Sequence, residues 1–216
     1  MIRCAGQGRR RLLAWYWWLL LGLFSWALAQ EMSDTGAVDY SAFPAALDRA
    51  QRQVQTNAAA VQAAVAQCPC ARLWAAAAAF FPVTGDARAL EQVVGAVLFD
   101  EIFRRDALDD FFDQAAIAGA DVTQSTLGLP QILPRTAQEA NQALANLSLL
   151  EIGQRLAADA AFAIAQVPFV LDLKLRSANS LLGSVALYHG SQSIDDRTRQ
   201  ILSAENLSMI RQLLGG

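Results

Sequence analysis

The sequence has few cysteine and histidine residues, the ligands typical of zinc sites: three cysteines and a single histidine, His189, among 216 residues. Cys4 lies in the N-terminal segment, while Cys68 and Cys70 form the close pair Cys-Pro-Cys. Two thiolates and one distant histidine do not make a convincing ligand set, so we expect no metal centre and no cofactor. We expect the cysteine pair to brace a turn between two helices, whether or not the two are bridged.

The sequence also lacks a fixed-period repeat, sustained heptads and a Gly/Ser-rich linker, which argues against a solenoid, a long coiled coil and two linked domains. Its composition, 54% hydrophobic and 17% charged, excludes a disordered chain. No segment shows a clear β-strand pattern. We therefore predict an all-α fold, with a flexible lead-in over residues 30–42 and a single helical domain over residues 43–216.

Charge is absent from residues 12–29, an apolar stretch that follows a basic opening with four arginines. The stretch ends in Ala27-Leu28-Ala29, the small-x-small pattern of a signal-peptide cleavage site. We predict a signal peptide over residues 1–29 and a periplasmic or secreted protein. A retained membrane anchor is the alternative, because 18 uncharged residues are just enough to span a bilayer. No cysteine stands near residue 30 to carry a lipid.

Basic residues are scarce in the chain that remains after cleavage. Removing the four arginines of residues 1–29 from the 17 basic residues leaves 13, against 20 acidic residues, a net charge of −7. Phosphates repel such a surface, so we expect no nucleic-acid partner.

Apolar periodicity and capping residues predict the individual helices. Ser41 is expected to cap a helix with Pro44 in its first turn, and Asp86 to cap the helix that follows the turn after Pro82. Pro168 is expected to stop or bend a later helix. The predicted helices cover residues 44–65, 71–81, 87–104, 106–118, 134–144, 147–165, 195–202 and 204–214.

The helix over residues 87–104 carries an acid on its apolar face. Glu101 follows Val94, Val97 and Leu98 at the spacing i, i+3, i+4 and i+7, so it points towards the core, whereas Asp100 falls about a third of a turn away and can reach water. Burial should raise the pKa of Glu101 and suit it to general-acid chemistry. The alternative is that an arginine neutralises it, with Arg104, Arg105 or Arg72 as the candidates.

The segment 125–137, Ser-Thr-Leu-Gly-Leu-Pro-Gln-Ile-Leu-Pro-Arg-Thr-Ala, has the composition of a groove wall. Gly128 permits close backbone approach, two prolines stiffen the chain, and Gln131 is an uncharged hydrogen-bonding group among apolar residues. An ordinary loop entering a helix is the alternative.

This segment resembles the Gly-Leu-Met-Gln motif, followed by Ile/Leu-x-Pro-x-Thr-Ala, of the lytic transglycosylases and goose-type lysozymes. The order of motifs is also similar: a glutamate on a buried helix (Glu101), then Gly128 to Gln131, then Ala186-Leu187-Tyr188-His189-Gly190 in the place of an Ala-Tyr-Asn-Gly-like segment. The resemblance covers residues 87–192 and implies a lysozyme-like fold. Four departures affect substrate preference and product type: Glu101 lacks the usual Glu-Ser context, its spacing to Gly128 is longer than usual, Pro130 replaces Met, and His189 replaces Asn.

The resemblance implies that Glu101 protonates the oxygen between N-acetylmuramic acid and N-acetylglucosamine in peptidoglycan glycan strands. The N-acetyl group of the substrate can then stabilise the cation, so a second carboxylate is not required, and the product is either a 1,6-anhydro ring or a hydrolysed end.

The resemblance also implies that five residues bind the substrate, each with a plain structural alternative: Ser125, Thr126, Gly128, Gln131 and Tyr188. Ser125 and Thr126 would bond acetamido groups or cap the turn, and Tyr188 would reach the glutamate or cover a sugar, or else be a core tyrosine with a satisfied hydroxyl. Three acids would position water or form a solvated helix face: Asp106, Asp109 and Asp110. His189 has no assigned role.

Three classes of function fit these patterns. The first is an exported enzyme that cleaves peptidoglycan strands, with an envelope assembly as a further partner for which it would open the wall locally. The second is a glycan-binding module that keeps the groove without turnover. The third is an alanine-rich helical envelope protein with no glycan role. In each, we expect contact with a membrane only through an uncleaved N-terminal segment.

Overall fold

The structure is a computed structural model that describes residues 36–81 and 86–216, without the side chains of residues 86 and 87. In this part of the chain the regular elements are helices, and the only β-type pairing is an isolated bridge between Leu127 and Ile132, which confirms the all-α prediction. The elements are η1 (Tyr40–Ala42), α2 (Pro44–Thr56), α3 (Ala58–Gln67), α4 (Ala71–Phe80), α5 (Asp86–Arg104), α6 (Ala107–Ile117), α7 (Pro134–Ala140), η2 (Gln142–Leu144), α8 (Leu149–Ala158), α9 (Ala160–Ala178), α10 (Leu181–Tyr188), α11 (Asp196–Ile201) and α12 (Ala204–Leu213). Three sequence predictions lie outside the described residues and side chains: the signal segment, the turn after Pro82 and the Asp86 cap.

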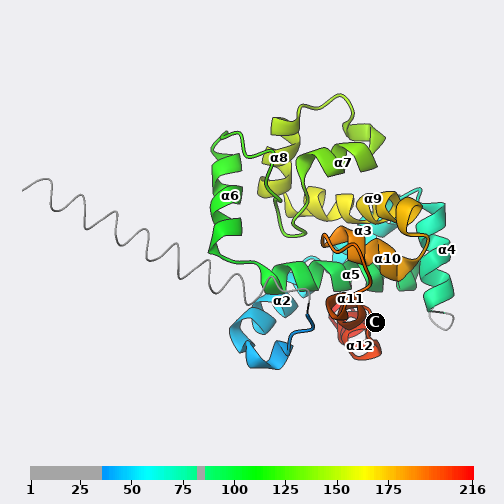
Figure 1. The fold of residues 1–216 in the computed structure, drawn as a ribbon. Helices are drawn as coiled ribbons and strands as arrows, with labels where there is room; N and C mark the ends of the chain where they lie inside the picture. Colours follow the sequence, from blue (N-terminus) through cyan, green and yellow to red (C-terminus); the bar gives the residue numbers. More distant parts are fainter. Residues whose placement is uncertain (1–35, 82–85) are drawn as a thin grey trace, which may run out of the picture.

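Helix α5 runs through the middle of the fold, with α2, α11 and α12 on one side and α9, α7 and α8 on the other (Figure 1). Its central position explains its composition, because a helix covered on most sides is apolar on most sides. Phe99 and Phe103 are fully buried, and Tyr40 packs edge-on against both rings at 5.1 and 4.7 Å between centroids. Each buried phenylalanine contributes about 1.5–3 kcal/mol to the free energy of unfolding.

Several helix boundaries differ from the sequence prediction: a break at Asn57 divides the helix predicted over residues 44–65 into α2 and α3, and α10 was not predicted. Ser41 is not the cap of the first helix: it lies inside η1, where its hydroxyl bonds Asp39, and α2 begins at Pro44 after Phe43. Pro168 does not stop a helix but lies within α9. The break comes earlier, at Asp159, whose carboxylate caps α9 and where the axis turns by 115° relative to α8. A side-chain cap ends one helix and starts another without any proline.

The described part of the lead-in lies against the domain. Tyr40 donates a hydrogen bond to Asp100 of α5, and the Val38 amide donates to the Gln200 side chain of α11. The carbonyl of Gly36 accepts from Arg104. Residues 36–42 therefore form part of the packed structure.

Cys68 and Cys70 join α3 to α4 through a disulfide across Pro69, in agreement with the expected role of bracing a turn. Among the described residues, no single helix is long and apolar enough to cross a membrane, although α8 and α9 would pass on length and composition if their 115° bend were ignored.

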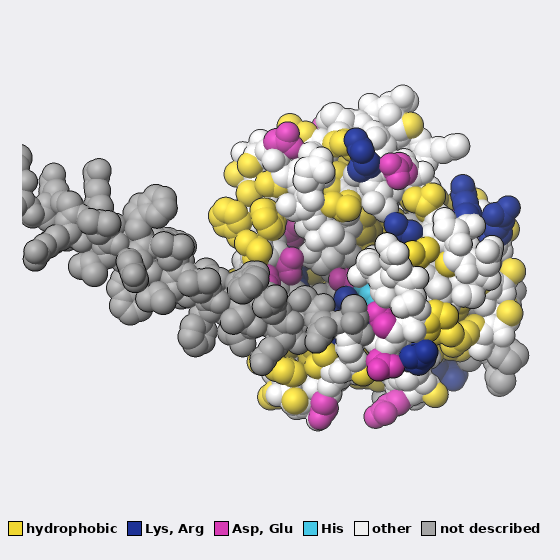
Figure 2. Space-filling model, viewed as in Figure 1, with side chains coloured by type: hydrophobic (Ala, Val, Ile, Leu, Met, Phe, Trp, Pro, Cys, Tyr) yellow, Lys and Arg dark blue, Asp and Glu magenta, His cyan; other side chains and the backbone are white. Residues whose placement is uncertain are grey.

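Helix α6 forms one outer edge of the molecule and has two different faces. Leu108 and Phe111 are 54% and 62% exposed, and Figure 2 shows hydrophobic side chains gathered along this edge. Another face of α6 carries Asp109, which borders the cleft described next.

Candidate functional site

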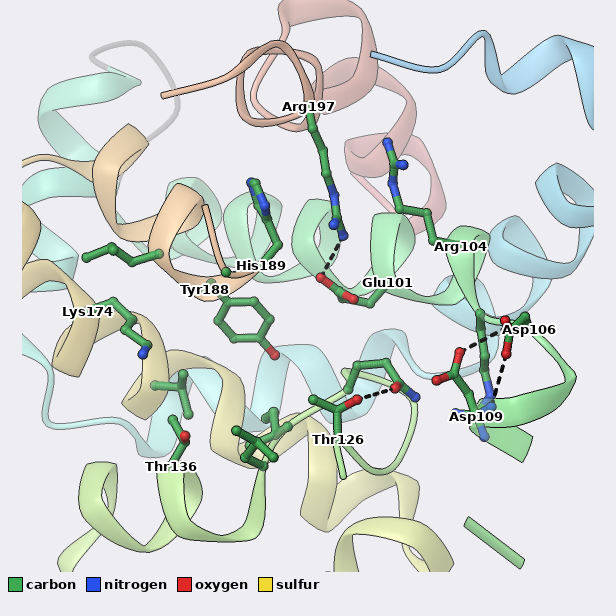
Figure 3. Close-up of a pocket in the computed structure, with 17 residues that line it drawn as sticks. Glu101, Arg104, Asp106, Asp109, Thr126, Thr136, Lys174, Tyr188, His189 and Arg197 are labelled. Atoms are coloured by element: carbon green, nitrogen blue, oxygen red, sulfur yellow. Dashed lines mark hydrogen bonds and ion pairs between the residues drawn. The ribbon is translucent and has the colours of Figure 1, made fainter. Parts of the chain in front are cut away.

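A cleft of about 520 Å³ opens between α5, α9, α10 and α11 and the loop that precedes α7. This volume lies within the range of small-ligand sites. The lining side chains are both charged and apolar (Figure 3): Glu101, Arg104, Arg105, Asp106, Asp109, Thr126, Gln131, Ile132, Leu133, Thr136, Val170, Lys174, Leu187, Tyr188, His189 and Arg197, together with Gly190.

Glu101 extends from the C-terminal half of α5 into this cleft, and its side chain is 13% exposed. Burial raises the pKa of Glu101 to about 7, with a smaller raising effect from Asp100 and an opposing effect from Arg197. The Nη2 atom of Arg197 lies 2.9 Å from the Glu101 Oε1 atom. Desolvation therefore outweighs the ion pair, and the carboxyl retains a proton to an unusually high pH.

The predicted exposure of Asp100 is wrong, because this residue is fully buried. Its carboxylate accepts from Arg197 Nε at 2.7 Å, from Arg104 Nε at 3.2 Å and from the Tyr40 hydroxyl at 3.1 Å. Periodicity within α5 could not reveal this, since η1 and α11 cover the Asp100 side of the helix. The partner of Glu101 is likewise Arg197 of α11, and none of the three arginines considered from the sequence.

The segment before α7 forms a tight turn closed by two backbone hydrogen bonds between Leu127 and Ile132, each 3.0 Å. Gly128 and Gln131 both have positive φ, +73° and +51°. The Gln131 amide donates to the Gly128 carbonyl at 2.9 Å, and its oxygen accepts from the Thr126 hydroxyl at 2.8 Å. Left-handed backbone at a non-glycine residue is strained, so these contacts hold Gln131 against a local energetic cost.

Two of the five predicted binding residues do not line the cleft. Ser125 lies in the preceding turn, where its amide bonds the Val122 carbonyl. Gly128 instead faces α8: a Cβ atom there would lie 2.3 Å from the Leu156 carbonyl oxygen. Its amide also donates to Asp113 of α6 at 2.8 Å. Gly128 thus holds the turn against α6 and α8, while Thr126, Gln131 and Tyr188 line the cleft.

Replacing Gly128 by alanine should lower the free energy of unfolding by about 2–5 kcal/mol, because left-handed strain adds to a backbone clash. Gly119→Ala is the matched control: φ is +87° there, but its Cβ would meet only the Gln154 side chain at 3.6 Å, so about 1–2 kcal/mol is expected. Urea unfolding of both variants measures the difference. Equal losses would show that the approach to Leu156 does not matter.

Tyr188, at the end of α10, donates its hydroxyl to the Pro130 carbonyl at 2.8 Å. This bond connects α10 to the turn that carries Gln131. Burial raises the pKa of Tyr188 well above its usual value, with a further raising effect from Glu101, so the phenol stays protonated. The structural alternative for this residue is met, because its hydroxyl is hydrogen-bonded. Tyr188 also lines the cleft, and its contact with a sugar stays a prediction.

His189 lies beside Tyr188, and its Nε2 atom is 2.9 Å from the Thr198 hydroxyl. That hydroxyl donates to Asp195 at 2.7 Å, so the histidine Nε2 carries the proton in this hydrogen bond. Burial, together with the nearby charge of Arg197, lowers the pKa of His189 to about 4. The ring is therefore neutral near pH 7.

The three acids that follow Glu101 have structural partners. Asp106 caps α6, and the Asp109 carboxylate accepts from the Asp106 amide in return, while Asp110 pairs with Arg105 at 2.8 Å. Asp106 and Asp109 line the cleft and Asp110 does not. Burial raises the pKa of Asp109. Among the described residues, no group of three or more His, Cys, Asp or Glu side chains is arranged to hold a metal ion.

No family model, curated protein or solved structure matches this chain. The site therefore rests on its own geometry and on the sequence motifs. Sequence reasoning missed Arg197 and Lys174, both of which line the cleft. No local signal distinguishes them, because they come from helices that were noted only for their apolar or capping residues.

Proposed function

We propose that this chain is an exported enzyme that cleaves the glycan strands of peptidoglycan, with Glu101 as the general acid and with a lysozyme-like arrangement of helices. The observation that carries the proposal is the Glu101 carboxyl: it faces a cleft, it is largely desolvated, and its pKa is raised to about 7. A protonated carboxyl in a cleft is the group needed to protonate a leaving oxygen.

The neighbouring side chains support this role. Tyr188 and Gln131 border the same cleft as Glu101 and are held by hydrogen bonds to the backbone of the turn. The tyrosine ring offers an apolar face for a sugar, and the Thr126 hydroxyl lies beside the Gln131 amide oxygen where an acetamido group could compete for it.

The reaction begins with transfer of the Glu101 proton to the glycosidic oxygen between N-acetylmuramic acid and N-acetylglucosamine. The substrate's own N-acetyl group stabilises the resulting cation, and the Glu101 carboxylate next acts as base. Taking the proton from the 6-hydroxyl gives the 1,6-anhydro end, and taking it from water gives the hydrolysed end. Asp106 and Asp109 are the candidates for positioning that water, because both border the cleft.

A second function, glycan binding without turnover, is favoured by the ion pair between Arg197 and Glu101. An arginine at 2.9 Å stabilises the charged carboxylate, which cannot donate a proton. The two functions make opposite demands on the pKa of Glu101, and direct titration separates them.

Strand cleavage should decline on the alkaline side with a midpoint near pH 7, because the acid must be protonated and the pKa of Glu101 is raised to about 7.

The raised pKa of Glu101 should also make the free energy of unfolding depend on pH. A carboxyl whose folded pKa exceeds its unfolded value of 4.5 stabilises the fold below pH 4.5, and this contribution is lost as the pH rises through about 7. Rates against pH, together with NMR titration of labelled glutamate, measure both. A Glu101 pKa below 4.5 would support the binding module.

The proposed location is the periplasm or the exterior, with residues 1–29 as the export signal and peptidoglycan strands as the partner. Fractionation of cells expressing the chain, with N-terminal sequencing of the product, tests cleavage after Ala29.

A further inference from the structure

Lys174 is the only lysine in the chain; the other 16 of the 17 basic residues are arginines. It lies on α9, is half-buried, and lines the cleft. Figure 3 shows its ammonium group entering the cleft at the end that holds Thr136, whereas Asp106 and Asp109 lie at the opposite end.

The three arginines of the cleft are already paired with carboxylates of the protein. Arg104 bonds Asp100, Arg105 bonds Asp110 and Asp113, and Arg197 bonds Asp100 and Glu101. Their guanidinium groups are therefore held by carboxylates of the fold.

Lys174 differs from these arginines, because it makes no ion pair or hydrogen bond with any described residue. The nearest acid along its helix, Asp172, is taken by Arg176 at 2.9 Å. The Asp172–Arg176 pair lies outside the cleft, and it leaves the ammonium of Lys174 free for a ligand. An unpaired cation in a partly desolvated cleft attracts an anionic group more strongly than one in open water.

We propose that Lys174 binds the carboxylate carried by a muramic acid unit, and that this contact sets which glycosidic bond faces Glu101. The inference rests on the proposed function and adds a specificity residue to it. N-acetylglucosamine is neutral, whereas each muramic acid carries a lactyl carboxylate or, when that group is amidated, a stem peptide with carboxylates of its own. The acidic end of the cleft, Asp106 and Asp109, repels the same groups, so the strand enters in one direction.

The test compares three substrates on the full chain: neutral chitohexaose, peptide-stripped strands with free lactyl carboxylates, and strands with stem peptides. Lys174→Met should lose about tenfold in kcat/KM on a carboxylate-bearing strand and little on chitohexaose, and mass spectrometry should show a mixed set of product ends. A loss on the peptide-stripped strands identifies the lactyl carboxylate as the group bound, and a loss only on strands with stem peptides identifies a carboxylate of the peptide. Lys174→Arg should retain most of the preference. Arg211→Met removes the same charge from an exposed position on α12, outside the cleft, and should leave the preference unchanged.

A binding measurement keeps this inference separate from the proposed function. Reductive methylation with labelled formaldehyde marks only Lys174 and the N-terminal amine, and in a Glu101→Gln background the strands stay intact. The Lys174 signal should shift with carboxylate-bearing strands and not with chitohexaose. A chain that cleaves strands with the same preference after Lys174→Met, or a signal that does not move, overturns the role of Lys174 and leaves the proposed function standing. A chain that cleaves no strand overturns the proposed function, and the labelled lysine then decides the binding role alone.

Discussion

Glu101→Gln should reduce strand cleavage by at least about 100-fold, because the amide keeps the shape of the side chain and removes the proton that the leaving oxygen needs. Clearing of purified peptidoglycan, with mass spectrometry of the released fragments, measures the loss. The uncharged amide also removes a partner of Arg197, so the free energy of unfolding must be measured beside the rate.

Glu91→Gln is the matched control for this variant. Glu91 lies on the same helix, α5, about 15 Å along its axis from Glu101, and borders a different hollow of the surface. The same chemical change there should leave cleavage unaltered. Undiminished activity in a folded Glu101→Gln variant would remove the catalytic assignment and leave the binding module as the better proposal.

Arg197→Met should lower the free energy of unfolding by about 3 kcal/mol, because it leaves the fully buried Asp100 without its shortest partner. The loss should stay near the lower end for a broken buried pair, since Arg104 and Tyr40 still bond Asp100. The variant should also raise the pKa of Glu101 further, because Arg197 is the main group that lowers it. The alkaline limb of the pH profile should therefore move to higher pH.

Arg199→Met supplies the control for Arg197. Arg199 lies two residues further on α11 and pairs with Asp196 in an exposed bridge, so its loss should change the free energy of unfolding by no more than about 1 kcal/mol. If Arg197→Met does not fold, Arg197→Lys retains a charge that cannot bridge both acids, and an intermediate loss is expected. Unchanged stability together with an unchanged pH profile would contradict the role of Arg197.

Several features of the site follow from local sequence, and others do not. The apolar face of α5 predicted that Glu101 is largely buried, as it is, although its side chain faces the cleft and not the core. Gln131 was singled out as a hydrogen-bonding group among apolar residues. The same periodicity misjudged Asp100, because its burial is imposed by η1 and α11 rather than by α5. Gly128 was predicted to let the backbone come close to a ligand, yet the group that comes close to it is the Leu156 carbonyl.

The sequence by itself determined the helical class and most helix ends, because hydrophobic periodicity and side-chain caps act over three or four residues. Asp106, Ser148 and Ser203 each cap a helix in this way. Only the tertiary structure decided the electrostatics of the cleft. Arg197 reaches Glu101 across 96 residues of chain, and its pairing depends on how α11 packs beside α5, which no local pattern encodes.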